Sequence, residues 1–219
     1  MAKIMTSSSR SRESLSLRLS KLKSYHSTEK YIWDIGCDHG ILGLSFAGLQ
    51  EVQEINLVDP SEPVIDKLKD KIKDSYITTR VLIHHLPGQK MEIKSKNNLI
   101  YIAGMGGEEI GEIISSLLPQ LDSTSMFIIS PHRKILELRS LLGELPVSLV
   151  KEEVLFEDNQ HYQILALRPH SLSRPVSAYG EELWLGDTGR AYLKHQLNFF
   201  RLHRDEASQK YLEYLKTRK

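Results

Sequence analysis

The feature that most constrains the fold of this chain is an alternation of short apolar segments with amphipathic ones over its first 145 residues. The apolar segments have the length and β-branched composition of buried strands, at residues 30–36, 54–59, 80–85, 98–104 and 125–130. Segments with helical spacing of apolar residues lie at 41–50, 61–74, 105–121 and 132–145. Such alternation predicts an α/β fold, in which helices cover both faces of a mostly parallel sheet.

Two further strands close this pattern. The segments 147–156 and 161–169 flank "EDNQ", which predicts a β-hairpin. Five strands and a closing hairpin give a seven-stranded, mostly parallel sheet, the layout of Rossmann-like class I methyltransferases. We therefore divide the chain into a domain over residues 1–170 and a tail over 171–219. The tail is predicted to contain a linker with little regular structure and one long helix that begins after Thr188 or Gly189.

The two ends of the chain are basic, whereas the middle is acidic. Residues 1–30 carry seven Lys and Arg against two acids, residues 31–170 thirteen against twenty, and residues 171–219 nine against six. Two interpretations of the basic ends stay open: solvated helix faces, or a polyanion-binding surface built from both ends.

The basic N-terminal segment also has helical periodicity. Leu15, Leu19 and Leu22 recur at helical spacing, with Arg18 and Lys21 among them. This pattern predicts a basic amphipathic helix that precedes the first strand.

Composition excludes several classes of protein and site. No apolar run approaches the ~20 residues of a membrane span, and the N-terminus lacks the apolar core of a signal peptide. The single cysteine cannot form an internal disulfide, and no Cys/His cluster has zinc spacing. We expect a cytoplasmic protein with no membrane or metal partner. The oligomeric state stays open, since the last helix could pair with another chain or lie on its own domain.

A glycine loop, "DIGCDHG" at residues 34–40, follows the first predicted strand. Ligands of open parallel sheets bind at the carboxyl ends of strands, near the point where strand order reverses. Glycines there allow close approach of the backbone, and the amides of the next helix face the ligand. The loop matches the methyltransferase pattern acid-x-Gly-x-Gly-x-Gly, with Asp38 in place of the middle glycine. A tight turn that merely needs glycines is the plainer alternative.

Cys37 in this loop raises the question of a thiol nucleophile. A thiol at a helix N-terminus can have a lowered pKa, but no second cysteine exists to resolve a covalent intermediate. We therefore interpret Cys37 as a small loop residue.

Two more motifs follow predicted strands and favour a nucleoside ligand. Asp59 of "NLVDP" ends the second strand, where a carboxylate can accept hydrogen bonds from both ribose hydroxyls. The three glycines of "IAGMGG" end the fourth strand and leave backbone groups open to a ligand. The residues that we predict to bind the cofactor are Asp34, Gly36, Cys37, Gly40, Asp59, Pro60, His85, Gly104, Met105 and Gly106.

The fourth motif, "ISPHRK", follows the fifth strand. Ser130 and His132 are suited to contact a substrate base, and Arg133 and Lys134 a phosphate; a helix N-terminus capped by Ser130 is the plainer alternative. The residues that we predict to bind the substrate are Ser130, Pro131, His132, Arg133, Arg18 and Lys21.

Taken together, these motifs resemble those of the bacterial tRNA (adenine-N1)-methyltransferases that modify position 22 of tRNA. The resemblance runs from about Leu15 to Pro169, and more loosely through the final helix. It rests on "LSLRLSKL", "DIGCDHGIL", "IAGMGG" and "EEVLFEDNQHYQIL", and the combination of "GMGG" with "DIGxDH" is its specific part. The resemblance implies S-adenosylmethionine as cofactor, tRNA as partner, and a Rossmann-like domain with a C-terminal, coiled-coil-like helical extension.

The resemblance also implies that Asp38 and His39 are catalytic, where cofactor and target base meet. N1 of adenine has a free lone pair at neutral pH, so holding nitrogen, methyl and sulfur in line supplies most of the catalysis. Asp38 is suited to accept from the adenine amino group and to stabilise the positive charge formed on methylation. His39 either orients the base or holds the loop by hydrogen bonds.

Departures from the family pattern keep other functions open. The family loop has Ser and Ala in place of Cys37 and Gly40, tends to read Q-P-N at 130–132, and tends to have a G-N/D-G turn near 84–87. The alternatives are methylation of another RNA or of a small molecule, or a non-catalytic RNA-binding protein with a degenerate cofactor site.

Overall fold

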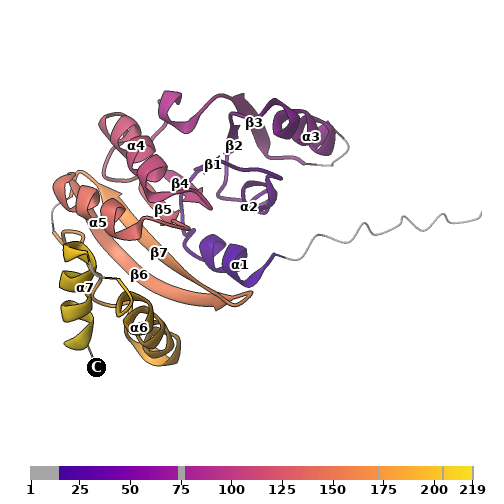
Figure 1. Cartoon of the computed structure of the whole chain (residues 1–219). Coiled ribbons are helices and arrows are strands. Elements are labelled where there is room, and N and C mark those ends of the chain that lie inside the picture. Colours follow the sequence, from indigo (N-terminus) through magenta and orange to yellow (C-terminus); the bar gives the residue numbers. More distant parts are fainter. Residues whose placement is uncertain (1–14, 74–76, 172, 204, 219) are drawn as a thin grey trace, which may run out of the picture.

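The sheet at the centre of the molecule has the predicted seven strands. The computed structural model describes residues 15–73, 77–171, 173–203 and 205–218, so the basic residues before Leu15 lie outside the described part (Figure 1). Strand order is β3-β2-β1-β4-β5-β7-β6. The strands are β1 Tyr31–Ile35, β2 Glu54–Asp59, β3 Arg80–His85, β4 Asn98–Ala103, β5 Met126–Ser130, β6 Val147–Glu157 and β7 Gln160–Pro169. The first five strands pair in parallel, and β7 is antiparallel to both β5 and β6, which confirms the predicted fold class.

Helices cover both faces of this sheet. The helices are α1 Leu17–Lys23, α2 Ile41–Leu44, α3 Glu62–Lys73, α4 Gly107–Leu117, α5 Ile135–Glu144, α6 Gly186–Phe200 and α7 Glu206–Lys216, with short 3₁₀ turns at Gly88–Lys90 and Leu118–Gln120. Strand side chains alternate between the faces. In β1, Ile32 packs into a core with α1, α2 and α3, whereas Trp33 and Ile35 pack into a core with α4 and α5. The helices pack on the faces of the sheet, and loops form its edge at the carboxyl ends of the parallel strands.

The two segments predicted as helices on either side of β1 differ in outcome. The N-terminal amphipathic helix is confirmed over α1, where Leu22 is fully buried and Leu19 packs against the core. The helix predicted over 41–50 is much shorter than expected, since α2 ends at Leu44. Gly48, within the predicted range, has a positive φ of 82°, which a right-handed helix does not allow. No helix of the described residues is both long and apolar enough to cross a membrane.

The β6–β7 hairpin turns at Asp158 and Asn159, as the motif "EDNQ" predicted. Both residues have positive φ, 49° and 61°. Two-residue hairpin turns of type I′ need positive φ at both central residues, and Asp and Asn tolerate it better than other non-glycine residues.

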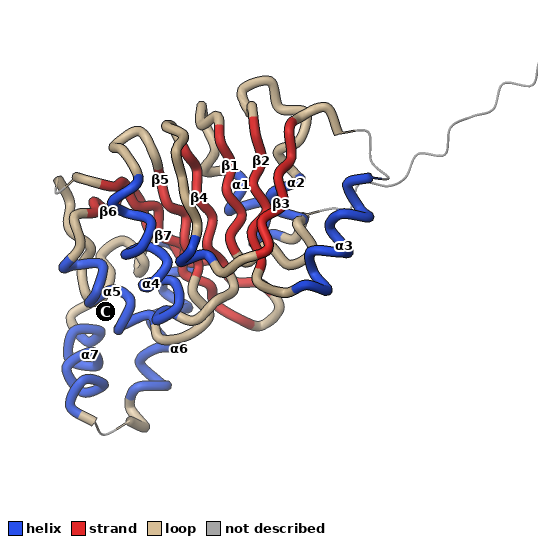
Figure 2. The backbone as a smooth tube through the Cα atoms, turned by 90° about the horizontal axis from the view of Figure 1, so that it is seen from above, coloured by secondary structure: helices blue, strands red, loops and turns tan. Residues whose placement is uncertain are grey.

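The prediction of one long helix after Thr188 is wrong. The chain forms two helices, α6 and α7, which lie at the β6–β7 end of the sheet, far from α3 (Figure 2). Asp205 caps α7 by accepting a hydrogen bond from the Ser208 amide at 2.9 Å. The ring of Tyr211 then lies 4.8 Å from that of Phe200, centroid to centroid. In a single straight helix these two residues would lie about 16 Å apart along the axis, too far for their rings to touch.

The linker that precedes α6 has no helix or strand at its described positions, as predicted, but a buried ion pair fixes it to the domain. The Arg139 guanidinium of α5 lies 2.5 Å from the Glu152 carboxylate of β6. Arg139 donates to the Ser177 carbonyl at 2.8 Å, and Glu152 accepts from the amides of Glu181 and Glu182 at 2.5 and 2.8 Å. The linker thus holds the C-terminal helices against the hairpin.

Candidate active site

Four strand ends meet at one edge of the sheet. Ile35 of β1 is paired with Val58 of β2 on one side and with Ile102 of β4 on the other, and Ala103 is paired with Ser130 of β5. The strand order reverses between β1 and β4, which is where open α/β sheets bind ligands. The four motifs singled out in the sequence therefore begin side by side.

The loop after β1 is attached to the end of β2. The amides of Gly36 and Cys37 both donate to the Val58 carbonyl, at 2.8 and 3.1 Å. Gly36 has a positive φ of 71°, and a Cβ there would clash with the Met105 side chain of the opposite loop. Glycine is therefore favoured here by its conformation, and its lack of a side chain leaves room for the terminal methyl group of Met105.

Asp59 joins the loops that follow β1 and β2. One of its carboxylate oxygens accepts from the Asp38 amide at 3.3 Å, and the other accepts from the Ser61 amide at 2.9 Å. The residue is 8% exposed. Each carboxylate oxygen has a second lone pair, so Asp59 can still accept hydrogen bonds from a ligand.

Asp34 lies behind the loop and not on its open side. One oxygen of its buried carboxylate accepts from the Gly43 amide at 2.8 Å. This bond caps the first turn of α2, whose N-cap residue, Gly40, has no side chain. Burial raises the pKa of Asp34 to about 6, and the charge of Asp59 adds to this rise while the bond from Gly43 opposes it.

The Cys37 thiol is unsuited to nucleophilic chemistry. Burial raises its pKa well above the usual range, and the negative charges of Asp34 and Asp59 raise it further. The thiol therefore stays protonated at neutral pH, in keeping with a small loop residue. Gly40 in the same loop has a φ of 64°, and a Cβ there would press on Leu68 of α3.

Asp38 and His39 are the exposed residues of this loop. Their side chains are 70% and 62% exposed, and the Asp38 carboxylate lies 3.7 Å from Nε2 of His39. Asp38 has a positive φ of 47°, and its amide is bound to Asp59. The backbone thus fixes the position of Asp38 while its carboxylate stays open to a ligand.

The loops after β4 and β5 form a second joined pair. The amide of His132 donates to the Met105 carbonyl at 3.0 Å, and the amide of Gly107 donates to the Arg133 carbonyl at 2.9 Å. Gly106 and Arg133 form a parallel β-bridge. Met105, whose side chain contacts Gly36, therefore links this pair of loops to the first pair.

Two features of the second pair bear on ligand binding. Gly104 has a φ of 85°, and the space that a Cβ would occupy is empty. The Ser130 hydroxyl is buried and has no hydrogen-bond partner among the described residues. A buried, unpaired hydroxyl is costly, so this group is suited to pair with a ligand or an ordered water.

Helix α1 reaches the loop after β5 through Arg18. Nη1 of Arg18 lies 2.6 Å from Nε2 of His132, and its guanidinium stacks 4.8 Å from the centre of the Tyr162 ring. Because guanidinium only donates, His132 accepts with a neutral ring. Burial and the Arg18 charge both lower the pKa of His132. Lys21 lies apart from this group, paired with Glu153 at 2.8 Å.

The loop after β3 adjoins the loop after β2. Nε2 of His85 lies 3.1 Å from the Pro60 carbonyl. His84 instead belongs to the sheet interior, where its ring stacks on Trp33 and bonds the Asn56 side chain at 2.8 Å. Of the two histidines, only His85 extends the edge that carries Asp59.

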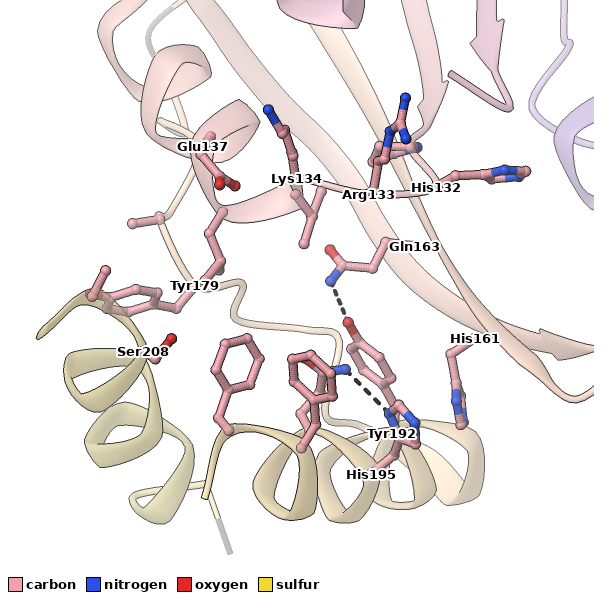
Figure 3. Close-up of a pocket in the computed structure, with 18 of the residues that line it drawn as sticks. His132, Arg133, Lys134, Glu137, His161, Gln163, Tyr179, Tyr192, His195 and Ser208 are labelled. Atoms are coloured by element: carbon pink, nitrogen blue, oxygen red, sulfur yellow. Dashed lines mark hydrogen bonds between the residues drawn. The ribbon is translucent and has the colours of Figure 1, made fainter. Parts of the chain in front are cut away.

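A large cavity that the motifs did not predict lies beside the loop after β5. It measures about 840 Å³ and lies between that loop, the hairpin turn and helices α6 and α7 (Figure 3). Of the residues singled out in the sequence, its lining includes Pro131, His132, Arg133 and Lys134. The one signal in the sequence is a polar and aromatic row beside the apolar stripe of α6, comprising Tyr192, His195, Gln196, Phe199 and Phe200. Among the described residues, no group of His, Cys, Asp and Glu side chains could hold a metal ion.

Comparison with known sequences gives a family match over most of the chain. Residues 15–165 match the model of a methyltransferase domain. The tRNA (adenine(22)-N(1))-methyltransferase of Bacillus subtilis (strain 168) is 24% identical over 151 residues, which cover 69% of this chain and 63% of that protein. A putative tRNA methyltransferase of Mycoplasma genitalium, MG248, is 25% identical over 181 residues, 80% of each chain. The first match thus spans less than two thirds of the relative's length.

Solved structures share the fold, including its C-terminal part. Streptococcus pneumoniae Sp1610, a putative tRNA (m1A22) methyltransferase in complex with S-adenosyl-L-methionine, has a TM-score of 0.79 at 18% identity, over 94% of this chain and 99% of that one. The M1A22 tRNA methyltransferase TrmK of B. subtilis has a TM-score of 0.73 at 20% identity, over 94% and 95%. TrmK of M. capricolum, in complex with S-adenosyl-homocysteine, has a TM-score of 0.70 at 18% identity, over 93% and 94%.

Proposed function

The chain belongs to the methyltransferase domain family, and from this premise we propose that it methylates N1 of an adenine in tRNA, at position 22, with S-adenosylmethionine as the methyl donor. One observation carries the proposal: Asp59 accepts a hydrogen bond from the amide of Asp38. This bond joins a carboxylate suited to ribose to an exposed carboxylate suited to a base. A cofactor and a target base bound to these two residues would be neighbours.

The sheet edge fits S-adenosylmethionine, which supplies an electrophilic methyl group when it is bound. Asp59 accepts from the ribose hydroxyls through its remaining lone pairs. Gly36 and Gly104 let the backbone approach the ligand, since both have positive φ and neither carries a side chain. Pro60 and His85 line the neighbouring part of the edge. The remaining residues of the predicted cofactor site shape it: Asp34, Cys37 and Gly40 support the first loop, and Met105 and Gly106 belong to the second.

Asp38 and His39 hold the target adenine in this proposal. Asp38 accepts from the adenine amino group and balances the positive charge that methylation places on the ring. N1 needs no base to remove a proton, so the protein contributes mainly position. His39 orients the base beside Asp38. N1 lies on the pairing edge of adenine, so the base must leave its stack to react.

The rest of the tRNA binds to basic groups near the same loops. Arg133 is exposed and forms no ion pair with any described residue, so it is free to contact phosphate. Ser130, Pro131 and His132 belong to the same loop, and Arg18 of α1 bonds to His132. Lys21 is held by Glu153 and contributes by fixing α1 on the hairpin. In this division, residues 1–170 carry the chemistry, residues 171–219 contribute to RNA binding, and the enzyme works where tRNA is, in the cytoplasm.

Two measurements test the proposal. Calorimetry with S-adenosylmethionine is expected to show one binding site, and absence of binding at millimolar cofactor would exclude an enzyme of this family. Incubation with cofactor and an unmodified tRNA transcript that carries adenine at position 22 should then yield 1-methyladenosine, located by mass spectrometry of nuclease fragments. Cofactor binding without a methylated RNA product would point to a small-molecule substrate.

A further inference from the structure

The cavity between the domain and the C-terminal helices, named here the C-terminal cavity, has the size of a ligand site. Its volume of about 840 Å³ falls within the ~300–1,000 Å³ typical of sites for small organic groups. The loop after β5 forms one wall, the hairpin turn a second, and helices α6 and α7 a third (Figure 3). The cavity can therefore hold one nucleotide and is too small for a duplex.

The C-terminal cavity adjoins the candidate active site through a shared wall. Its lining includes His132 and Arg133, whose backbone is bonded to Met105 and Gly107. The side chains of His132 and Arg133 point away from α6, toward the sheet edge (Figure 3). An RNA whose target adenine lies at Asp38 would thus pass over this loop and reach the cavity with a neighbouring nucleotide.

The groups inside the C-terminal cavity suit an uncharged, flat ring. Tyr179 and Phe199 supply aromatic rings, and Phe199 is 48% exposed. His161 and His195 lie together on one side of the cavity, with rings 5.3 Å apart (Figure 3). Neither ring nitrogen of His161 has a hydrogen-bond partner among the described residues, nor has the Tyr179 hydroxyl. Unpaired nucleobases are recognised by this combination of stacking rings and hydrogen-bonding groups.

The charges around the C-terminal cavity suit a polyanion that continues outside it. Arg133 and Lys134 belong to the lining; Lys134 pairs with Glu108 at 2.6 Å, whereas Arg133 is exposed and forms no ion pair with any residue that the structure describes. Two acids, Glu137 and Asp205, belong to the lining, and Asp205 is engaged in capping α7. A phosphate group is therefore favoured at Arg133, beside the cavity, and an uncharged base inside it.

We propose that the C-terminal cavity binds one unpaired nucleobase of the RNA substrate, next to the target adenine, with the base stacked on Phe199 and its edge facing His161 and His195. This subsite rests on the proposed function, because it requires an RNA substrate. Burial and the proximity of His195 lower the pKa of His161, so its neutral ring offers both a donor and an acceptor to the base. The subsite would let helices α6 and α7 select RNA in which an unpaired nucleotide lies next to the target adenine.

The test compares RNA binding by full-length variants on α6. Phe199→Ala is expected to weaken binding of a tRNA transcript about tenfold, the effect of losing one stacked base, whereas Phe199→Tyr keeps a ring and should bind like wild type. Leu202→Ala is the matched control, since Leu202 is 82% exposed, follows α6 and lies outside the cavity lining. His195→Ala should also weaken binding of tRNA.

Binding of a fully paired RNA stem should be equal for all variants. Ultraviolet cross-linking of wild-type protein to tRNA should mark peptides that contain Tyr179 or Phe199.

The outcomes separate the subsite from the proposed function. If wild type methylates tRNA while Phe199→Ala and His195→Ala bind it as tightly as Leu202→Ala does, the subsite is wrong and the function stands. Cross-links confined to the loops after β1 and β5 would support the same conclusion. If wild type binds S-adenosylmethionine but no tRNA, the proposed function falls and the subsite with it.

Discussion

Arg139 and Glu152 form an ion pair 2.5 Å long, with side chains that are 1% and 0% exposed. Arg139 belongs to α5 and Glu152 to β6, and both also bond the backbone of the linker before α6. The pair therefore holds together three parts of the chain that are distant in sequence. Removing one partner would leave the other charged and buried.

Breaking this pair should destabilise the protein strongly. We expect Glu152→Gln to lower the free energy of unfolding by about 3–5 kcal/mol, the range for a buried charge that loses its partner. Urea denaturation measures the loss. Glu213→Gln, which removes the exposed partner of Lys216, is the control and should cost less than ~1 kcal/mol. Equal effects of the two substitutions would show that the Arg139–Glu152 pair contributes no more than a surface pair.

Asp38→Ala should abolish methyl transfer and spare cofactor binding. Apart from its contact with His39, the Asp38 side chain has no polar partner in the described part of the chain, and the amide of residue 38, which bonds Asp59, survives the substitution. We expect the rate of transfer to fall at least 100-fold, as for loss of a preorganised electrostatic contact, while the dissociation constant for S-adenosylmethionine changes less than about threefold. A fully active variant would remove the proposed role of Asp38.

Asp59→Ala, unlike Asp38→Ala, should weaken the binding of S-adenosylmethionine. Hydrogen bonds to a charged group contribute about 1.5–3 kcal/mol each, so losing those to the ribose should weaken S-adenosylmethionine binding at least tenfold. Calorimetry measures the change. Asp66→Ala on the exposed face of α3 is a matched control, and cofactor affinity equal to that of this control would contradict the ribose contact.

Asp34 should make stability depend on pH in the acidic range. Its pKa is about 6 in the folded state and near 3.9 when unfolded, so the folded state binds the proton more tightly. This contribution to stability is complete below pH ~4 and is lost as pH rises through about 6. The shift of ~2 pKa units corresponds to about 3 kcal/mol. Asp34→Asn keeps an acceptor for Gly43 and should lack this fall, as urea denaturation from pH 4 to 7 would measure; parallel curves for the two proteins would contradict the raised pKa.

Cys37 should be unreactive in the folded protein. Its raised pKa and burial predict slow alkylation by iodoacetamide at pH 7.5 and fast alkylation once urea unfolds the chain. Cys37→Ser should retain methyl transfer within about threefold of wild type. Rapid alkylation of the native protein, or an inactive serine variant, would reopen a chemical role for the thiol.

Local patterns predicted much of the fold and of the candidate site. The strand ends and the loops that carry Gly36, Asp59 and Gly104 follow from short runs of sequence, because strand composition and glycine placement act locally. The break between α6 and α7 depends on Phe200 meeting Tyr211, a contact between residues of two helices. The support that Asp34 gives to Gly43 and the burial of Arg139 likewise depend on the assembled fold. The C-terminal cavity exists only after the hairpin, the linker and both helices have packed.

The two hydrogen bonds to Asp59 have a thermodynamic consequence for any nucleoside that binds there. The carboxylate is held by two backbone amides, from Asp38 and Ser61, before a ligand arrives. Little rotameric freedom is then left for Asp59 to lose when the ligand binds, so less of the interaction energy is offset by ordering entropy. Preorganisation of this kind favours a high affinity from few contacts. The exposed Asp38 side chain, by contrast, keeps its rotameric freedom until a ligand binds.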